Sequence, residues 1–295
     1  MGIYSISDLA ELTGVKTHTL RVWEKRYGLL QPQRTDTNIR YYEDKDLQML
    51  RLVQKLNANG VRISRIAGMS AAEMEAECRR ISRRNDVNEE KLHEALQKLD
   101  VTTMDAVLDE SIHDHGFEST LVNLILPFIS KMEVLWLSGN IEEAHEATFY
   151  ELVKRKTIRE IDMMPHNCSG PKVIMFLPEG NQQELSHLFL HYFLRQQGLC
   201  ITDIGCSKNL DCVCSALKQR EFECVIVGNA DPVHWQFGAF IQTLSERTDV
   251  PIIVSGRASN ENWHKENPRI IVIDSIEDTI RFVSSLKENL ENHLS

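Results

Sequence analysis

The segment PEGNQQELSH, from Pro178 to His187, joins a polar loop to the start of an apolar periodic stretch. It follows the apolar run KVIMFL and leads into ELSHLFLHYFL, so the sequence predicts a strand, a loop and a helix. In α/β proteins, loops after the carboxyl ends of strands bind ligands. This loop offers the amides of Asn181, Gln182 and Gln183, which suit transition metals poorly beside imidazole. We therefore expect a binding loop that lacks metal-ligand chemistry.

Two other groups of side chains have spacings that could bind a metal. His187 and His191 lie four residues apart, so they share one face of the predicted helix, but no carboxylate lies within the motif. Cys212 and Cys214 lie two apart and point to nearly opposite sides of a helix. No nucleophile–base group and no pair of carboxylates stands out. The sequence therefore predicts neither a catalytic site nor a metal site, and the chain is not expected to be an enzyme.

The elements around the loop predict an α/β domain in the last third of the chain. Short apolar or β-branched runs alternate there with helical patterns, which is typical of a doubly wound, Rossmann-like or flavodoxin-like parallel sheet covered on both faces. The expected strands are 172–177, 200–204, 224–228, 251–256 and 269–273, and the expected helices are 184–197, 209–219, 235–246, 260–266 and 275–292.

The rest of the chain predicts two helical regions. A head at 1–84 has short helices at 7–14, 17–28, 44–60 and 61–69, with a β-hairpin or wing at 29–42. A capping box at Ser70 and Glu73 starts a further helix, which we expect to fray into a linker near Asn85. A four-helix bundle follows at 85–168, and the α/β domain occupies 169–295.

Charge is divided unevenly between the head and the rest of the chain. Residues 1–84 hold 15 Lys and Arg against 10 Asp and Glu, a net charge of +5, whereas the remainder holds 18 against 33, a net charge of −15. A basic head on an acidic body fits a protein that contacts nucleic acid through the head alone. The seven cysteines have no framework spacing, and no apolar run approaches the ~20 residues that span a bilayer. We therefore expect a reduced, cytoplasmic protein without a membrane segment.

The head has the residue types that DNA recognition requires. Short polar or basic side chains near the start of a recognition helix can reach base edges, and cations and hydroxyls on a wing can reach phosphates. Leu20, Trp23, Leu29 and Leu30 are expected to form the core beneath them. The candidate DNA contacts are Lys16, Thr17, His18 and Arg21 on the helix and Arg34, Thr35, Asn38, Arg40 and Tyr41 on the wing.

The stretch THTLRVWEKRYGLLQPQRTDTNIRYYEDKDLQMLRLVQKLNANGVRISRI resembles the winged helix-turn-helix of the MerR family. The resemblance covers about 70 residues and implies that Arg21, Arg34, Arg40 and Tyr41 are DNA contacts. It also implies a palindromic double-stranded DNA operator bound by a homodimer or a higher homo-oligomer.

The remainder resembles the cobalamin-binding unit of methionine synthase and of cobalamin-dependent, light-sensing MerR regulators, in which a helical cap accompanies a Rossmann-like domain. ILPFISKMEVLWLSGNIEEAHEATFYE resembles the cap, although Ala147 stands where that family has a histidine. In the loop, Gln183 replaces the histidine that ligates cobalt, Asn181 replaces an acid and Ser186 replaces a glycine. The residues that correspond to the family's pocket are Trp136, Glu146, Gly180, Gln183, Gly205, Ser255 and Gly256. The cofactor is therefore left open between cobalamin, another small ligand and none.

These features predict a sequence-specific transcriptional regulator, with repression favoured, whose body controls oligomerisation. One alternative is a functional sensor of cobalamin or another small ligand. A corrinoid methyltransferase-type carrier is disfavoured by the DNA-binding head and by Gln183. An antirepressor protein is a further candidate partner, since an acidic body could bind one.

Overall fold

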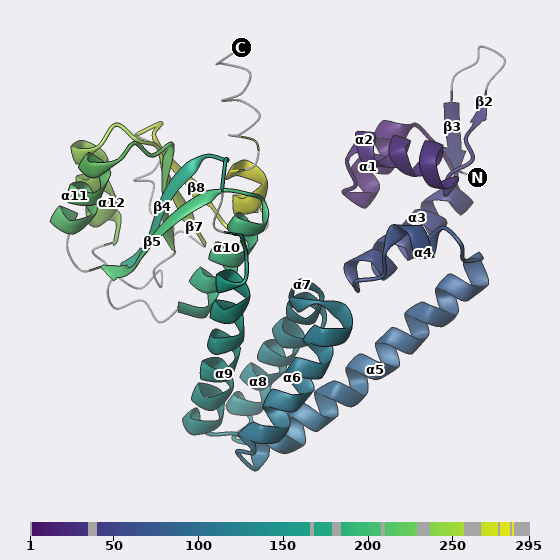
Figure 1. Cartoon of the computed structure of the whole chain (residues 1–295), viewed down its shortest axis with the longest axis horizontal. Coiled ribbons are helices and arrows are strands. Elements are labelled where there is room, and N and C mark those ends of the chain that lie inside the picture. The colour runs from purple at the N-terminus through teal and green to yellow at the C-terminus, as the bar shows by residue number, and fades with distance from the viewer. Residues whose placement is uncertain are drawn as a thin grey trace. The chain divides into compact units, whose positions relative to one another are not determined.

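The computed structural model describes residues 2–34, 40–165, 168–178, 184–207, 210–228, 237–256, 267–276, 278–283 and 285 (Figure 1). The chain divides into two compact units, Met1–Phe149 and Tyr150–Ser295.

The first unit begins with the predicted head. Its elements are β1 (Ile3–Tyr4), α1 (Ile6–Thr13), α2 (Thr17–Val22), the π-helical turn η1 (Trp23–Tyr27), β2 (Gln33–Arg34), β3 (Arg40–Glu43), α3 (Asp44–Ala58) and α4 (Ile63–Ile66). Ser5 caps α1 through a reciprocal hydrogen bond with Asp8, and Gly14 and Gly28 end their helices with positive φ. The predicted hairpin is present, because β2 pairs antiparallel with β3. The sequence did not indicate β1, which pairs with the other edge of β3.

One hydrophobic core holds the head together and reaches into the next helix. Leu20, Leu50 and Tyr42 are fully buried in this core, and Trp23 is buried as predicted. Met74 and Ile81 of the next helix, α5 (Ala71–Gln97), belong to the same cluster. The head is therefore packed on the first half of α5.

The linker expected near Asn85 does not interrupt the helix, so that expectation was wrong. α5 begins at the predicted Ser70 capping box and continues unbroken to Gln97. Its charged stretch forms an exposed helix face on which Glu75 pairs with Arg79 at 3.5 Å. Ile81 and Leu92 are buried on the other side. A run of charges thus marks the solvated side of a helix here.

The helices that follow α5 have their own core. They are α6 (Val101–His115), α7 (Phe117–Thr120), the π-helical turn η2 (Leu121–Ile125), α8 (Leu126–Leu137) and α9 (Glu143–Asp162), which runs across the boundary between the units. Phe128 and Phe149 pack edge to face with ring centroids 4.9 Å apart. Pro127 lies near the start of α8, directly after the π-helical turn η2.

Residues Phe117–Leu137 form the one stretch, among the described residues, that is long and apolar enough to cross a bilayer by length and composition. The expectation that no such run exists was therefore wrong. Only 33% of its most apolar window is buried, and a single stretch of this kind also occurs as a core helix of soluble proteins.

The second unit contains the predicted parallel sheet. Its strands are β4 (Lys172–Pro178), β5 (Cys200–Ser207), β6 (Cys224–Gly228), β7 (Ile252–Ser255) and β8 (Ile270–Ile273), in the order β5-β4-β6-β7-β8. Its helices include α10 (Glu184–Gln196), α11 (Leu210–Gln219) and α12 (Phe237–Arg247). The helix expected at 260–266 lies outside the described residues.

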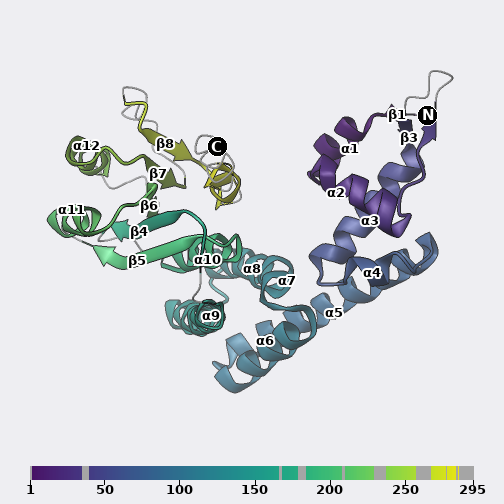
Figure 2. The ribbon, with the colours of Figure 1, turned by 45° about the horizontal axis from the view of Figure 1, so that its top comes forward.

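Apolar side chains alternate between the two faces of this sheet. Ile174 and Phe176 of β4 pack toward α11 and α12, whereas Val173 and Met175 pack toward α10 and the helical residues 278–283 (Figures 1 and 2). Both faces are thus covered, as parallel sheets require.

The cysteines depart from the expected reduced state in one place. Cys168 and Cys200 are joined by a disulfide, whereas Cys78, Cys206, Cys212, Cys214 and Cys224 are free. The spacing of the sequence could not show this pair, because strand pairing brings the two residues together.

Candidate nucleic-acid interface and ligand edge

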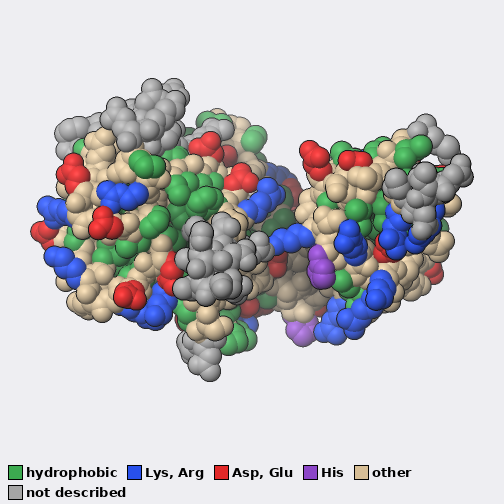
Figure 3. Space-filling view, turned by 90° about the horizontal axis from the view of Figure 1, so that it is seen from above, with side chains coloured by type: hydrophobic (Ala, Val, Ile, Leu, Met, Phe, Trp, Pro, Cys, Tyr) green, Lys and Arg blue, Asp and Glu red, His purple; other side chains and the backbone are tan. Residues whose placement is uncertain are grey.

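The start of α2 presents a polar, basic face to solvent. Lys16 precedes the helix, and its side chain is exposed, as are those of His18 and Arg21. Leu20 and Trp23, on the opposite side, are buried in the head core. Lys and Arg side chains gather over this part of the molecule (Figure 3). Three of the four predicted helix contacts, Lys16, His18 and Arg21, are therefore accessible to solvent, whereas Thr17 is half-buried.

The hairpin places two arginines opposite each other. Arg34 of β2 is the cross-strand partner of Arg40 of β3, and both are exposed. Two exposed guanidinium groups on the hairpin give it a basic surface of the kind that contacts phosphates. Tyr41 is half-buried, and the predicted contacts Thr35 and Asn38 lie outside the described residues.

Glu24 joins the hairpin to the second helix, a role that the sequence analysis missed. Its carboxylate accepts a hydrogen bond from the Tyr42 hydroxyl at 3.2 Å and pairs with Arg40 Nε at 3.3 Å. Burial, with the charge of Glu24, raises the pKa of Tyr42 to about 12, so the phenol remains a donor. The π-helical turn that carries Glu24 thereby orients Arg40.

A second group of arginines lies where the head meets α5 and α6. A cavity of about 360 Å³ is lined there by Asn59, Gly60, Val61, Arg62, Ser64, Arg65, Glu77, Arg80, Ile81, Arg84, Asp114 and His115. Arg80 donates twice to Glu77 at 2.8 Å, and Arg84 pairs with Asp114. The first pair lies within α5, and the second connects α5 with α6.

In the second unit, the strand order locates the edge where a ligand is expected. β4 lies between β5 and β6, so the chain reverses its direction of winding between β4 and β6. In open α/β sheets, ligands bind beyond the carboxyl ends of the strands at such a switch point. Here those ends are Pro178 and Gly228.

A histidine fills the space beside this switch point. His187 of α10 is 5% exposed, and a methyl group added at Gly228 would lie 3.2 Å from His187 Nδ1 and 3.2 Å from the side chain of Leu177. Nδ1 is buried and has no hydrogen-bond partner among the described residues. The side chain thus packs tightly between α10 and the end of β6.

Asp203 of β5 holds both histidines of the predicted i, i+4 pair. His187 Nε2 lies 3.0 Å from Asp203 Oδ1, and His191 Nδ1 lies 3.0 Å from Asp203 Oδ2. Burial alone would raise the pKa of Asp203, but the hydrogen bonds from the two histidines outweigh it and hold that pKa well below its usual range. The histidines therefore bind a carboxylate. Within the described ranges, no group of three or more His, Cys, Asp and Glu side chains could hold a metal ion.

Three predicted pocket residues of the second unit make internal contacts. Gly205 has a positive φ, and its N–H donates to Asp203 Oδ1 at 2.9 Å. The Ser255 hydroxyl is buried and bonded to the Thr279 hydroxyl at 2.9 Å. Gly256 follows directly at the end of β7 and donates to the Ile273 carbonyl at 2.7 Å. Asp203 was missed because the fold brings it to His187 and His191 from another element, and Thr279 was missed because it lies 24 residues from Ser255.

The other predicted pocket residues lie either outside the described residues or in the first unit. Gly180 and Gln183 lie outside the described residues. In the first unit, Trp136 is 54% exposed on α8 and Glu146 is half-buried on α9. His145 Nδ1 accepts the backbone N–H of Glu142 at 3.0 Å, so it is occupied at the start of α9.

Comparison with known proteins gives matches to the head and to the rest of the chain. Residues 4–73 match the MerR HTH family regulatory protein pattern. The chain is 27% identical over 211 residues to the HTH-type transcriptional repressor CarH of Myxococcus xanthus, covering 68% of this chain and 70% of the relative. It is 25% identical over 205 residues to CarA, an HTH-type transcriptional repressor of the same organism, covering 68% and 67%.

A solved structure has a fold similar to that of the body. The monomethylamine corrinoid protein of Methanosarcina barkeri aligns with a TM-score of 0.52 at 13% identity, covering 68% of this chain and 99% of that one. At this identity the likeness shows the fold alone.

The head, at residues 4–73, has a MerR-type HTH, and the relatives that the chain resembles are named transcriptional repressors and not enzymes. The body has a fold similar to that of a corrinoid protein.

Proposed function

We propose that this protein is a sequence-specific transcriptional repressor that binds a palindromic operator as a homodimer or a higher oligomer. The observation that carries the proposal is the exposed basic start of α2, supported from behind by the buried Leu20 and Trp23. In this assignment α2 enters the major groove of the DNA, and the β2–β3 hairpin forms a wing that contacts the DNA phosphates. Repression is favoured because CarH and CarA are named repressors, and DNA as the ligand implies a cytoplasmic protein.

We propose further that the body serves assembly and does not hold cobalamin through a histidine. In this assignment α5, α6, α8 and α9 form a four-helix bundle that corresponds to the cobalamin cap. The sequence has Gln183 where the related loop has the cobalt ligand. His187 and His191 are bound to Asp203, and His145 is bound to a backbone N–H. These residues do not fit a histidine-ligated cobalamin.

Selection of DNA from a pool of random duplexes by the full-length protein tests the assignment. We expect enrichment of an inverted repeat, with one complex whose mass corresponds to two or more chains. Recovery of DNA without any enriched sequence would refute sequence-specific recognition, and an enriched single half-site would refute the symmetric dimer.

The Arg40→Ala variant should weaken binding to every duplex to a similar extent. A wing arginine that meets a phosphate releases counterions, so each lost contact lowers the slope of log K against log salt by about 0.9. Arg83→Ala, at an exposed position on α5, is the matched control and should leave the slope unchanged. Titration by fluorescence anisotropy at several salt concentrations measures both. An unchanged slope for Arg40→Ala would mean that its pairing with Glu24 is purely structural.

The Gln183→His variant should fail to bind cobalamin tightly. A single histidine supplies the missing ligand type, but Asn181, Ser186 and Ala147 still depart from the related pattern, and His187 still fills the space beside Gly228. Absorbance spectra after dark incubation with adenosylcobalamin or methylcobalamin and desalting should show no corrin bands for either protein. Bands retained by the unmodified protein would instead establish a functional cobalamin sensor, and bands retained by the variant alone would show that Gln183 was the only obstacle.

A further inference from the structure

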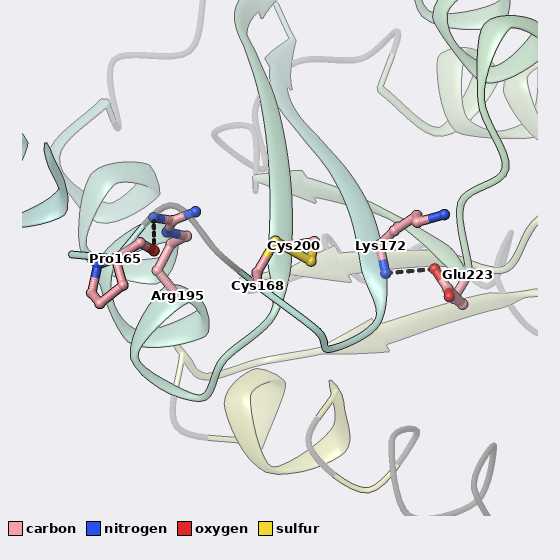
Figure 4. Close-up of a disulfide and its surroundings, with 6 residues drawn as sticks. All are labelled: Pro165, Cys168, Lys172, Arg195, Cys200 and Glu223. Carbon is pink, nitrogen blue, oxygen red and sulfur yellow. Dashed lines mark hydrogen bonds between the residues drawn. A yellow bond between two sulfur atoms is a disulfide. The ribbon is translucent and has the colours of Figure 1, made fainter.

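Cys168 and Cys200 are joined by a disulfide although 32 residues separate them in sequence (Figure 4). Cys168 lies in the segment that leads into β4 and is exposed. Cys200 is the first residue of β5 and is 9% exposed. Cys168 is therefore the more exposed residue of the pair, and Cys200 is shielded.

The backbone around the pair is held in place by contacts that do not involve sulfur. β4 and β5 begin in register at Lys172 and Cys200, and the Cys200 N–H donates to the Pro171 carbonyl at 2.9 Å. Gly170 approaches the Gly198 carbonyl so closely that a Cβ would not fit. These contacts belong to the sheet and its entry turn, so the two thiols remain neighbours when the disulfide is reduced.

The segment before Cys168 has its own anchor. Arg195 of α10 donates to the Pro165 carbonyl at 3.0 Å, and the Lys172 N–H donates to Glu223 at 2.5 Å (Figure 4). Between these two anchors, the disulfide is an additional attachment of the segment to β5. Its presence or absence therefore changes how firmly residues 168–171 are tied to the sheet.

The other cysteines are less suited to oxidation. Cys78, Cys214 and Cys224 are buried, and burial raises the pKa of the Cys224 thiol to about 12. A thiol must form the thiolate to react, so such residues are inert. Cys206 and Cys212 are exposed, and within the described residues both are free thiols. Exposure and a partner within bonding distance occur together at Cys168.

We propose that Cys168 and Cys200 are a reversible oxidation site for low-molecular-weight disulfides of the glutathione type. The Cys168 thiolate attacks one sulfur of the small disulfide, forms a mixed disulfide and releases one small thiolate. The Cys200 thiolate then attacks the Cys168 sulfur and releases the second. Two protein thiols and one small disulfide thus become one protein disulfide and two small thiols, and the two protons pass to the released thiolates. In a reducing compartment the pair is dithiol, and oxidation is the signal.

Equilibration of the full-length protein with mixtures of reduced and oxidised glutathione tests this site. After an acid quench, alkylation and mass spectrometry count the free thiols. We expect the count to fall from the seven cysteines of the sequence to five as oxidised glutathione increases, with a linked Cys168–Cys200 peptide pair, and to return to seven in excess reduced glutathione. Amide hydrogen exchange at 168–170 should be slower in the oxidised protein.

Matched variants separate this site from general oxidation. Cys168→Ser and Cys200→Ser should each abolish the paired loss of two thiols, whereas Cys212→Ser, which removes an exposed cysteine on α11, should leave it intact. Absence of the linked peptide, or linkage mainly to Cys206 or Cys212, would overturn the proposal. A bond that reduced glutathione cannot open in the folded protein would also overturn it, because the pair would then be a permanent cross-link.

Discussion

Replacing Arg21 with alanine is expected to weaken binding to the selected operator by about 1–3 kcal/mol for each head. A homodimer makes the contact twice, so the loss in operator affinity should reach about 2–6 kcal/mol. The physical reason is that the Arg21 side chain extends from the exposed face of α2, where a guanidinium can donate two hydrogen bonds to a guanine edge. Non-specific duplexes should lose far less affinity.

Fluorescence anisotropy with the operator and with single-base variants of it measures this effect. Arg21→Lys is the matched control, since it keeps the charge but loses the bidentate geometry, and it should lose most of the discrimination while retaining the salt slope. Thermal unfolding should change little for either variant, because an exposed helix position tolerates both residues. An equal loss on all duplexes would show that Arg21 contacts phosphates only.

Replacing Asp203 with alanine should destabilise the sheet unit by about 2–4 kcal/mol. The substitution removes the shared acceptor of the buried His187 and the partly buried His191, and each donor left unpaired away from water costs about 1–3 kcal/mol, whereas the exposed Gly205 N–H can bond to water. Asp211→Ala is the matched control, since its carboxylate is 77% exposed and pairs with Arg247 at the surface. That change should cost no more than about 1 kcal/mol.

The effect of Asp203 should also depend on pH. Because its folded pKa is depressed, its carboxylate contributes stability that is fully present above the unfolded value of about 3.9 and is lost as pH falls toward the folded pKa. The difference in unfolding free energy between the unmodified protein and Asp203→Asn should therefore shrink as pH falls below about 4. Urea unfolding with hydrogen exchange of the β4–β6 amides measures it. A difference that grows on acidification would refute the assignment.

Much of the fold could be predicted because its signals are local. The Ser5 and Ser70 caps are satisfied within three residues, and Gly14 and Gly28 stop helices by their own backbone freedom. Short apolar or β-branched runs between helical patterns located all five parallel strands. The error at Asn85 arose because the charged run was interpreted as a linker, although burial of Ile81 and Leu92 is what decides that α5 continues.

The candidate sites could be predicted only in part. The exposed basic face of α2 follows from helix periodicity, so Lys16, His18 and Arg21 were found. The carboxylate of Glu24, which orients Arg40, acts across 16 residues of sequence and left no local signal. Asp203 likewise lies 12 and 16 residues from its two histidines on another element.

The sequence by itself determined the MerR-type head, the doubly wound sheet and the identity of Gln183, because residue types, capping and periodicity are encoded within short windows. Only the tertiary structure decided that His187 and His191 share Asp203, that His187 packs against Gly228, and that Cys168 meets Cys200. The physical reason is that these contacts depend on how parallel strands align and on which helix covers which end of the sheet. Packing of the whole unit sets that alignment, and no single stretch of sequence records it.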